Sequence, residues 1–345
     1  MTGPSAVVAA VRSAVRRTLT EVLAAEPDAL LVLVAASGGA DSTALAAALA
    51  FEAPRARLRA GLLIVDHAWS DGSGERAAAV AAQGRNLGLD PAVVLHAPSP
   101  RQEGPAREHR RDALLGAAVA HGAAAVLLGH TLDDQAETVL LRLARGSGSR
   151  SLAGMPAVNG LLRRPLLGLR REQTREFCRV VGLDVWDDPA NDDPQFLRSR
   201  VRTELLPVLA EVLGPGAVPA LARSADLLRD DADALDAAAD RAEAGTEVLA
   251  VDGLTVDGLG RLEPAVRSRV LRRAALRAGC PPTDLSAAHI AAVDGLVTGW
   301  RGQGPLSLPG GLAATRRDGR ISFVPDRAEE HPRAGLPTEP KGTSP

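Results

Sequence analysis

Strand-like and helix-like patterns of apolar residues alternate along residues 1–215. Nearly continuous apolar runs, typical of strands buried on both faces, lie at residues 30–36, 60–65, 92–95 and 124–129. Helical spacing of apolar residues lies between them, at residues 42–51, 75–87 and 108–121. This alternation predicts an α/β fold, a doubly wound parallel sheet with helices on both faces.

The pattern changes after about residue 205. Residues 218–244 are rich in Ala, Leu and Asp and predict one long helix with an acidic exposed side. Two further helices and three short strands then predict a smaller α+β domain, at residues 264–278, 286–297, 305–308, 311–314 and 321–324. We expect an α/β domain at 1–215, a helical linker at 216–245, a C-terminal domain at 246–326 and a disordered tail at 327–345.

Charge leaves the class of partner open. The net charge of −2 and the pI of about 6.4 argue, as bulk figures, against a nucleic-acid-binding protein. The signs are segregated, however, because arginines crowd residues 142–202 and acids crowd residues 226–243. A solvated surface of mixed charge explains the same counts. Lys341 is the only lysine, so an internal cationic role falls to arginine, whose planar fork suits phosphate.

Three further features point to a soluble protein of the cytoplasm. Cys178 and Cys280 form no CxxC pair, and nothing indicates a disulfide framework. The N-terminal apolar stretch contains arginines, which a signal peptide would not tolerate, and it predicts an amphipathic surface helix. The apolar residues 113–129 are interrupted by His121 and Gly122, so we expect a helix and a strand there and no membrane span.

A glycine-containing loop follows the first apolar run, with the residues Ser37, Gly38, Gly39, Ala40, Asp41 and Ser42. Glycines let backbone N–H groups approach an anion, and the helix that begins here adds unpaired donors and a positive dipole end. A carboxylate beside phosphates needs a cation, so Asp41 suggests Mg²⁺. The Walker signature and its lysine are absent. A plain strand–helix turn with Asp41 as a helix cap is the alternative.

Two more polar clusters follow predicted strands. Asp66 and His67 come after the second run, and residues 129–134 after the fourth. The carboxyl ends of parallel strands meet at one edge, so all three clusters would line one crevice. Asp134 and Glu137 share a helix face, which calls for a cation. For His130, a buried structural role is the alternative.

These residues carry a resemblance. SGGADS at 37–42 resembles the pyrophosphate-binding loop of the adenine-nucleotide α-hydrolase-like superfamily, whose members cut ATP between its α and β phosphates. GHTLDDQAET at 129–138 is similar to the GHxxDDxxET segment of tRNA(Ile)-lysidine synthetases. Further pieces resemble that family in its order, at residues 106–110, 145–148, 152–155, 164–167, 188–192, 198–202 and 302–311. Arg111 and Ser199 stand where that family often has Tyr and Asn, which puts details of cytidine recognition in doubt.

The resemblance implies a PP-loop ATP pyrophosphatase domain that joins free L-lysine to C2 of the wobble cytidine in a CAU-anticodon tRNA(Ile). ATP first adenylates the C2 oxygen, and the lysine amine then displaces AMP. The implied cofactors are ATP, held by residues 37–42 with Asp66 and His67, and Mg²⁺, held by Asp41. A homodimer is left open.

The same resemblance assigns roles to individual side chains. Asp134 and Glu137 would bind the lysine ammonium and accept its proton. Arg107 would hold the cytidine, and His130 would contact the adenylated intermediate. Phosphates of tRNA or ATP would be contacted by Arg145, Arg198 and Arg202, and the C-terminal domain would grip the tRNA.

Three other functions share the ATP loop. A tRNA thiolase needs reactive cysteines or an iron–sulfur cluster, and neither Cys178 nor Cys280 resembles a sulfur relay. A small-molecule amide synthetase leaves the arginine-rich stretch without a purpose. A non-catalytic nucleotide-binding module leaves the acids of residues 133–137 without one.

Overall fold

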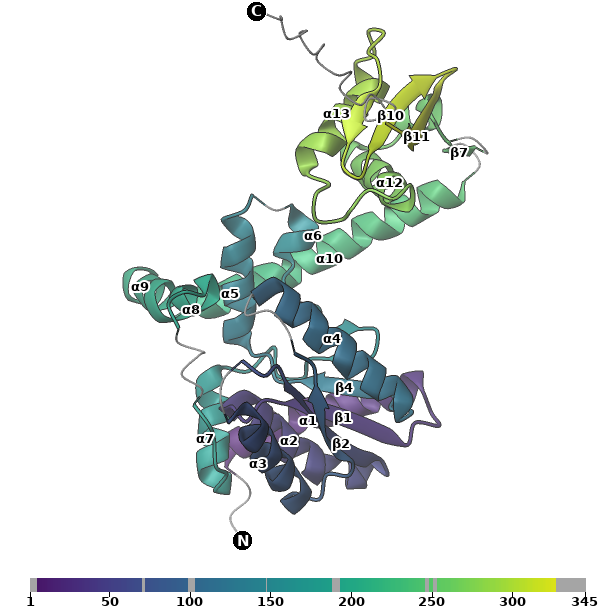
Figure 1. The fold of residues 1–345 in the computed structure, drawn as a ribbon. Helices are drawn as coiled ribbons and strands as arrows, with labels where there is room; N and C mark the ends of the chain where they lie inside the picture. The colour runs from purple at the N-terminus through teal and green to yellow at the C-terminus, as the bar shows by residue number, and fades with distance from the viewer. Residues whose placement is uncertain are drawn as a thin grey trace, which may run out of the picture. The chain divides into compact units, whose positions relative to one another are not determined.

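The computed structural model describes residues 5–69, 72–98, 103–146, 148–187, 193–245, 248–250 and 253–326 (Figure 1). The resembling segment at 188–192, Ser147 and the predicted tail at 327–345 lie outside the described residues. The chain divides into two compact units, Met1–Arg229 and Asp230–Pro345. The division falls within the long helix α10 (Ala217–Ala244). The domain limits expected from the sequence stay a prediction.

A six-stranded sheet forms the centre of the first unit, in the order β3-β2-β1-β4-β6-β5. Its strands are β1 (Leu31–Ala36), β2 (Arg59–Asp66), β3 (Ala92–His96), β4 (Ala125–Leu128), β5 (Val158–Asn159) and β6 (Leu162–Arg163). All neighbours pair in parallel except β5 with β6, a two-residue hairpin that the sequence did not predict. The predicted α/β fold with a mostly parallel sheet is confirmed.

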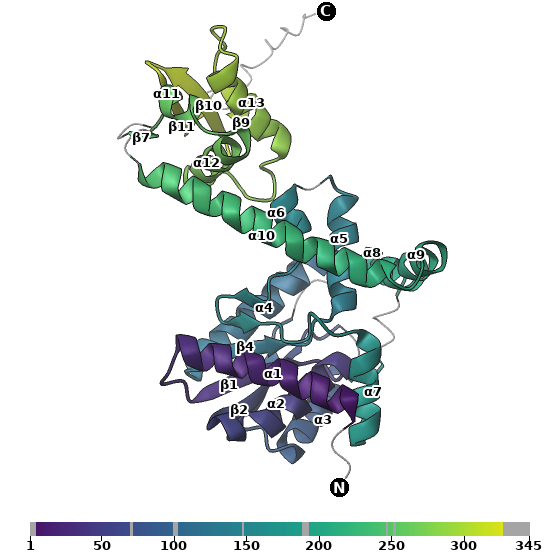
Figure 2. The same cartoon turned by 180° about the vertical axis from the view of Figure 1, so that it is seen from behind.

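Helices cover both faces of this sheet because successive residues of β1 point to opposite sides. Val32 and Val34 pack against α1 (Ala6–Ala25), α2 (Ala40–Glu52), α3 (Ser73–Asn86) and α7 (Arg171–Val181). Leu31 and Leu33 pack against α4 (Glu103–Ala120) on the other face. Figure 1 shows α4 in front of the sheet, and Figure 2 shows α1 across the opposite face.

The rest of the first unit is helical. It comprises η1 (Pro54–Ala56), α5 (Leu132–Leu143), α6 (Ser149–Leu152), α8 (Leu197–Arg200), a π-helical turn η3 (Val201–Leu205), α9 (Leu206–Leu213) and the start of α10. A small apolar cluster of Ala136, Val201, Leu206 and Val218 joins α5 to η3, α9 and α10. It brings residues from the second half of the arginine-rich stretch against α5, the helix that carries Asp134 and Glu137.

The second unit packs three helices against an antiparallel sheet of order β7-β8-β11-β10-β9. Its elements are β7 (Leu249–Ala250), β8 (Gly253–Thr255), α11 (Val256–Gly260), α12 (Pro264–Arg277), α13 (Ala287–Thr298), β9 (Leu306–Leu308), β10 (Leu312–Arg317) and β11 (Arg320–Pro325). The predicted small α+β architecture is present in this unit.

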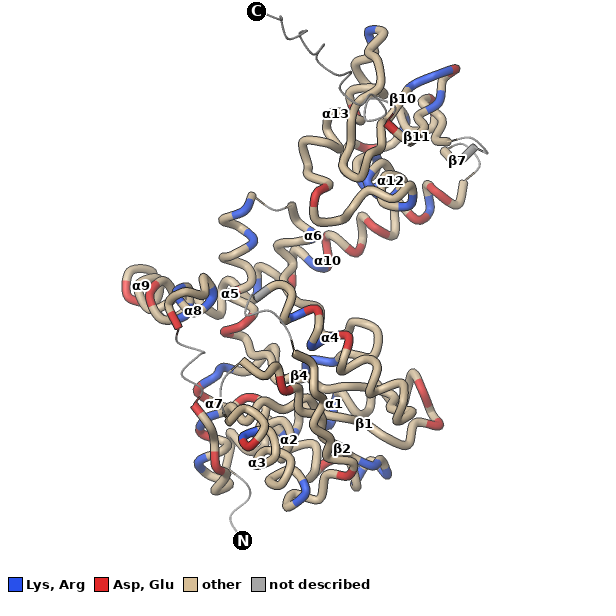
Figure 3. The backbone as a smooth tube through the Cα atoms, in the orientation of Figure 1, with Lys and Arg blue, Asp and Glu red and all other residues tan. Residues whose placement is uncertain are grey.

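Arginines of α12 face the acidic side of α10 within this unit (Figure 3). Arg269 contacts Asp236 at 3.1 Å, Arg273 contacts Asp240 at 2.6 Å, and the Arg277–Glu243 distance is 3.0 Å. Acids of the predicted linker therefore neutralise three arginines of this helix.

Among the helices that the structure describes, no single one is long and apolar enough to cross a membrane. One bent pair, Leu197–Leu213 and Ala217–Ala244, reaches the required length and composition only when its two helices, which meet at 99°, are counted together.

Candidate active site

The glycine-containing loop joins β1 to α2 as the sequence predicts. Gly38 has a backbone φ of +87°, which residues other than glycine rarely adopt. A Cβ added there would lie 2.9 Å from Val80 Cγ2. Ser42 Oγ accepts a hydrogen bond from the Ser37 N–H at 3.1 Å and donates one to the Gly39 carbonyl at 3.0 Å. Thr43 Oγ1 donates to the Gly38 carbonyl at 3.2 Å. These hydrogen bonds hold the loop in a curved shape.

The loops after β2 and β4 flank this one, because β2 and β4 are the two neighbours of β1. At Gly129, just after β4, an added Cβ would lie 2.9 Å from the Ser42 nitrogen and 3.0 Å from the Asp41 carbonyl carbon. Only a residue without a side chain fits here. Crevices at such edges are the usual ligand sites of open α/β sheets.

Asp66 and His67 lie at the end of β2, on the side of β1 away from β4. Burial acts to raise the pKa of Asp66, but hydrogen bonds from the Ala68 N–H and from Ser73 outweigh it and hold that pKa below its ordinary value. Burial lowers the pKa of His67, whose ring stacks on Trp69 at 5.2 Å.

Asp134 and Glu137 project together from the first turns of α5. Asp134 Oδ2 accepts hydrogen bonds from the Thr131 N–H and hydroxyl, at 2.8 and 3.0 Å, and so caps the helix. Asp134 is 7% exposed, and Glu137 is fully buried. Two buried carboxylates at one point demand positive charge.

Three arginines supply that charge and complete what we call the acid–arginine cluster. Glu137 contacts Arg198 at 2.7 Å, Arg202 at 2.8 Å and Arg171 at 3.1 Å. Asp134 Oδ1 lies 2.9, 3.3 and 3.5 Å from Arg171, Arg198 and Arg202. Burial acts to raise the pKa of Asp134, but Arg198 and Arg171 outweigh it and lower that pKa to about 2.

Arg171 also reaches the ATP loop. Its Nε lies 3.6 Å from Asp41 Oδ2, and the Thr174 hydroxyl donates a hydrogen bond to Asp41 Oδ1. Burial raises the pKa of Asp41 to about 6, since the Asp134 charge adds to burial while Thr174 and Arg171 oppose it. Asp41 is therefore a carboxylate that a further cation would stabilise.

His130 lies within electrostatic range of both Asp134 and Arg107. Its Nδ1 is buried without a hydrogen-bond partner among the described residues. Burial, with the charges of Arg164, Arg198 and Arg107, lowers the pKa of His130 to about 3 against the effect of Asp134. The imidazole is consequently neutral at physiological pH. Arg107 itself is exposed, on the second turn of α4.

The structure separates the three arginines that the sequence assigned to phosphates. Arg145 is exposed just beyond α5. Arg198 and Arg202 have side chains only 17% and 25% exposed and point at the two acids. Their contact with tRNA stays a prediction, and in the structure both guanidiniums contact carboxylates.

Two family models match this chain, one in each of its two units. Residues 11–209 match the family model of the PP-loop domain, and residues 254–322 match the TilS substrate binding domain. A tRNA(Ile)-lysidine synthase of Streptomyces coelicolor is 54% identical over 347 residues, which covers 92% of this chain and 98% of the relative. One of Thermobifida fusca is 54% identical over 331 residues, covering 94% and 100%.

The chain belongs to the tRNA(Ile)-lysidine synthase family. A solved structure, the U34-tRNA thiolase NcsA from Methanococcus maripaludis with its [4Fe-4S] cluster, matches with a TM-score of 0.52 at 18% identity. That match covers 65% of this chain and 79% of the thiolase, and it concerns the fold.

Two residues that contact Asp41 were not predicted from the sequence. They are Arg171 and Thr174. Both lie on the first turn of α7 and reach Asp41. The sequence signal was weak, because Arg171 was one of many arginines in a crowded stretch. Only the packing of α7 against α2 makes it distinct.

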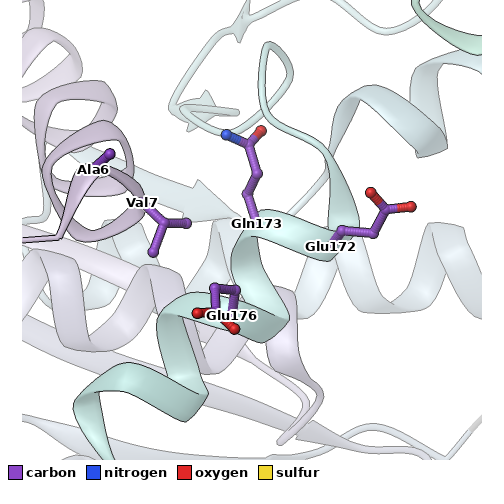
Figure 4. Close-up of a pocket in the computed structure, with 5 residues that line it drawn as sticks. All are labelled: Ala6, Val7, Glu172, Gln173 and Glu176. Atoms are coloured by element: carbon purple, nitrogen blue, oxygen red, sulfur yellow. The ribbon is translucent and has the colours of Figure 1, made fainter.

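An open pocket of about 410 Å³ between α1 and α7 is lined by Ala6, Val7, Glu172, Gln173 and Glu176 (Figure 4). None of these is a predicted site residue.

Proposed function

We propose that this protein is an AMP-forming ligase that joins free L-lysine to C2 of the wobble cytidine, position 34, in a CAU-anticodon tRNA(Ile), in the cytoplasm. The C2 oxygen of cytidine attacks the α-phosphorus of ATP, and pyrophosphate leaves. The lysine ε-nitrogen then attacks C2, the C2–O bond breaks, and AMP leaves with that oxygen. The modified base would pair with adenosine, so the codon read changes from AUG to AUA.

One observation carries this proposal. The ATP loop after β1 and the acid-rich segment after β4 are adjacent, with Gly129 against the backbone of Asp41 and Ser42. An activated base and an attacking amine have to meet at one point, and this packing gives them a common crevice. Family membership supports the same reaction.

ATP is held at its phosphates by residues 37–42, and Asp66 and His67 are proposed to hold the nucleoside. Mg²⁺ bound with ATP would supply positive charge on the phosphates. The residues present fit such an ion: Asp41 is a single carboxylate at the loop with a raised pKa, and Mg²⁺ in nucleotide sites takes one or two carboxylates plus phosphates and water.

Asp134 and Glu137 are proposed to act on lysine. At pH 7 the neutral amine lies about 3.4 pKa units, or about 4.6 kcal/mol, above the ammonium. A carboxylate that binds the ammonium and accepts its proton meets this demand. With a pKa of about 2, Asp134 is a weak base while the arginines surround it. The reaction therefore requires guanidiniums to withdraw from the acids, and the phosphates of ATP and tRNA are the anions that would attract Arg198 and Arg202.

The remaining predicted site residues are proposed to contact the acceptor tRNA. Arg107 and the neutral His130 are proposed to contact the cytidine and its adenylated form, and Arg145 a tRNA phosphate. The second unit is proposed to grip the tRNA away from the reacting base. A homodimer is compatible with this assignment and is not required by it.

A tRNA thiolase is the alternative that shares the fold. Cys178 and Cys280 are each 2% exposed. Burial raises the pKa of the Cys178 thiol to about 11, and its Sγ lies 3.4 Å from the Ala40 carbonyl oxygen. Buried, protonated thiols make poor sulfur carriers, so lysine ligation is favoured.

The proposal is tested with ATP, Mg²⁺, radiolabelled lysine and CAU-anticodon tRNA(Ile). We expect label in the tRNA and one AMP released for each lysine incorporated. A CAU-anticodon methionine tRNA, run in parallel, should stay unlabelled. Incorporation of sulfur, or no incorporation of lysine, would reject the assignment.

A further inference from the structure

Two sets of arginines near the candidate site differ in what their guanidiniums contact. Arg171, Arg198 and Arg202 contact carboxylates in the acid–arginine cluster. Arg142, Arg164 and Arg229 instead donate to backbone carbonyls, and none of these three pairs with a carboxylate in the part of the chain that the structure describes. We call the second group the carbonyl-held arginines.

The carbonyl-held arginines converge on one short segment, residues 151–156. Arg142 donates to the carbonyls of Ser151 and Gly154, at 2.5 and 2.9 Å. Arg229 donates to Met155 at 2.8 Å and also to Ala153. Arg164 donates to Pro156 at 2.8 Å. Three guanidiniums from α5, α10 and the end of β6 are therefore held at one place.

Carbonyl oxygens accept hydrogen bonds from a guanidinium but do not neutralise its positive charge. Arg164 is only 8% exposed, and its Nε is buried without a hydrogen-bond partner among the described residues. A buried guanidinium with no anion is unfavourable, so its presence calls for a ligand that brings the negative charge. Burial, and then the charges of Arg107 and Arg229, lower the pKa of Arg164 to about 10 and also lower the pKa of Arg142. The Arg229 charge therefore repels both of the others.

A second unpartnered group stands beside them. Within the described part of the chain His130 Nδ1 is buried without a partner, and the Arg164 charge is near enough to affect its pKa. Register explains this proximity, because β4 and β6 are parallel neighbours with Leu127 beside Arg163. His130 and Arg164 follow the ends of these two strands. Arg164 therefore lies close to His130, which is predicted to contact the adenylated cytidine.

From this geometry we propose that Arg142, Arg164 and Arg229 form a binding site for the phosphodiester backbone of the acceptor RNA, next to the nucleotide that reacts. This site rests on the proposed function for the identity of its RNA. Guanidiniums bind phosphate oxygens through paired N–H groups, which the fixed carbonyl contacts orient in advance.

Position favours the RNA over ATP as the source of the phosphate. The ATP loop follows β1, whereas Arg164 follows β6, two strands away and so roughly 10 Å along the sheet. Asp66 and His67, the proposed nucleoside contacts, lie on the other side of β1. If the nucleoside of ATP extends from the loop toward β2, the edge of the sheet near β6 is free for the acceptor RNA.

The test measures the affinity of the full chain for CAU-anticodon tRNA(Ile) over a series of salt concentrations. Arg142→Gln, Arg164→Gln and Arg229→Gln are each expected to weaken binding roughly tenfold at low salt. Each should also make the slope of log K against log salt shallower by about 0.7–0.9, the value for one lost phosphate contact. ATP affinity without tRNA should not change.

Arg179→Gln is the matched control, because Arg179 is already paired with Glu176 at 2.6 Å on α7. It removes one positive charge and should leave the slope unchanged. If the three arginines only secured residues 151–156, the variants would lower the thermal midpoint and keep the wild-type slope, and that result would overturn the site. Weaker ATP binding with an unchanged tRNA slope would assign the arginines to ATP and overturn it as well.

Failure of the site and failure of the proposed function give different results. If the wild type ligates lysine while all three variants keep its salt slope, the function stands and the site is rejected. If the wild type ligates no lysine yet the variants flatten the slope for RNA, the site stands and the function is rejected. Arg142 and Arg229, which are only partly buried, keep the test informative if Arg164→Gln folds poorly.

Discussion

Arg171 connects the ATP loop to the acid pair. Its guanidinium lies 3.6 Å from Asp41, 2.9 Å from Asp134 and 3.1 Å from Glu137. Any ligand that attracts this side chain toward the loop withdraws positive charge from the acids. A ligand at this loop would therefore change the charge around Asp134 and Glu137, in part through Arg171.

Removal of the Asp134 charge should separate ATP binding from turnover. In Asp134→Asn we expect lysine incorporation to fall at least about 100-fold, since a positioned acid–base group contributes about 10²- to 10⁴-fold. ATP affinity should remain within a few-fold of wild type, because the loop at 37–42 is intact. Asp112→Asn, which removes a carboxylate with a 67% exposed side chain, serves as the control. Wild-type turnover in Asp134→Asn would remove Asp134 from the mechanism.

The same carboxylate should contribute to acid stability. Its folded-state pKa of about 2 lies below the ordinary value of about 3.9, so its contribution is complete above pH 4 and is lost as the pH falls toward 2. The full contribution is roughly 2–3 kcal/mol, of which about 1 kcal/mol is lost by pH 3. Urea unfolding without ATP should show the gap between wild type and Asp134→Asn narrowing by that amount from pH 5 to pH 3. A constant gap would contradict the ion-pair geometry.

At the scale of elements, the site depends on the approach of two strand ends. The loop after β4 passes so close to the start of α2 that Gly129 has no room for a side chain. The same approach brings Asp134 to within electrostatic range of Asp41, as the pKa of Asp41 reflects. Backbone packing between strands, more than any single side chain, sets the spacing of the crevice.

Gly129→Ala should therefore damage the ATP loop. The new methyl group would meet backbone atoms at 2.9–3.1 Å, which have to move. We expect a loss of about 1–3 kcal/mol in unfolding free energy and roughly tenfold weaker ATP binding. Gly116→Ala is the matched control: it lies inside α4 with nothing within 4 Å, and it should stabilise the protein by about 0.5–1 kcal/mol. Equal ATP affinity in both variants would show that the loop tolerates displacement.

At the scale of the whole molecule, the chain consists of two units with separate cores. Ion pairs stabilise the second unit internally. Arg267 is 6% exposed and contacts Asp294 at 2.6 Å, besides donating to the Leu262 carbonyl at 2.8 Å. With the α10–α12 pairs, these contacts hold four arginines of the unit on its own carboxylates, namely Arg267, Arg269, Arg273 and Arg277.

Separate cores predict separate unfolding. Arg267→Gln should destabilise the second unit by about 3 kcal/mol, since it leaves Asp294 without its partner. Mg²⁺–ATP at about 100 times its Kd should instead stabilise the first unit by about 2.7 kcal/mol. Calorimetry should show the two changes in different transitions, with Arg241→Gln, an exposed position on α10, as a neutral control. Loss of both transitions together in Arg267→Gln would contradict two independent units.

Local patterns of apolar residues determine most of the elements. Apolar periodicity predicts β1, β2 and α2 within about two residues, because a strand or helix of this length buries one recurrent set of side chains. The hairpin of β5 and β6 was missed, since two-residue strands carry no periodicity and exist through pairing alone. The glycine loop and the acids of α5 were likewise readable as motifs, and their catalytic roles stay predictions.

The tertiary structure decided which charges meet. Arg198 and Arg202 lie 61 and 65 residues from Glu137 in the chain, and nothing local distinguishes them from Arg142 or Arg164. Folding places the first two on carboxylates and the other two on carbonyls. An ion pair between distant residues depends on distance and burial, and both arise only when the helices pack. The sequence by itself therefore determined the fold class and the chemistry available, whereas the packing determined which arginines carry uncompensated charge.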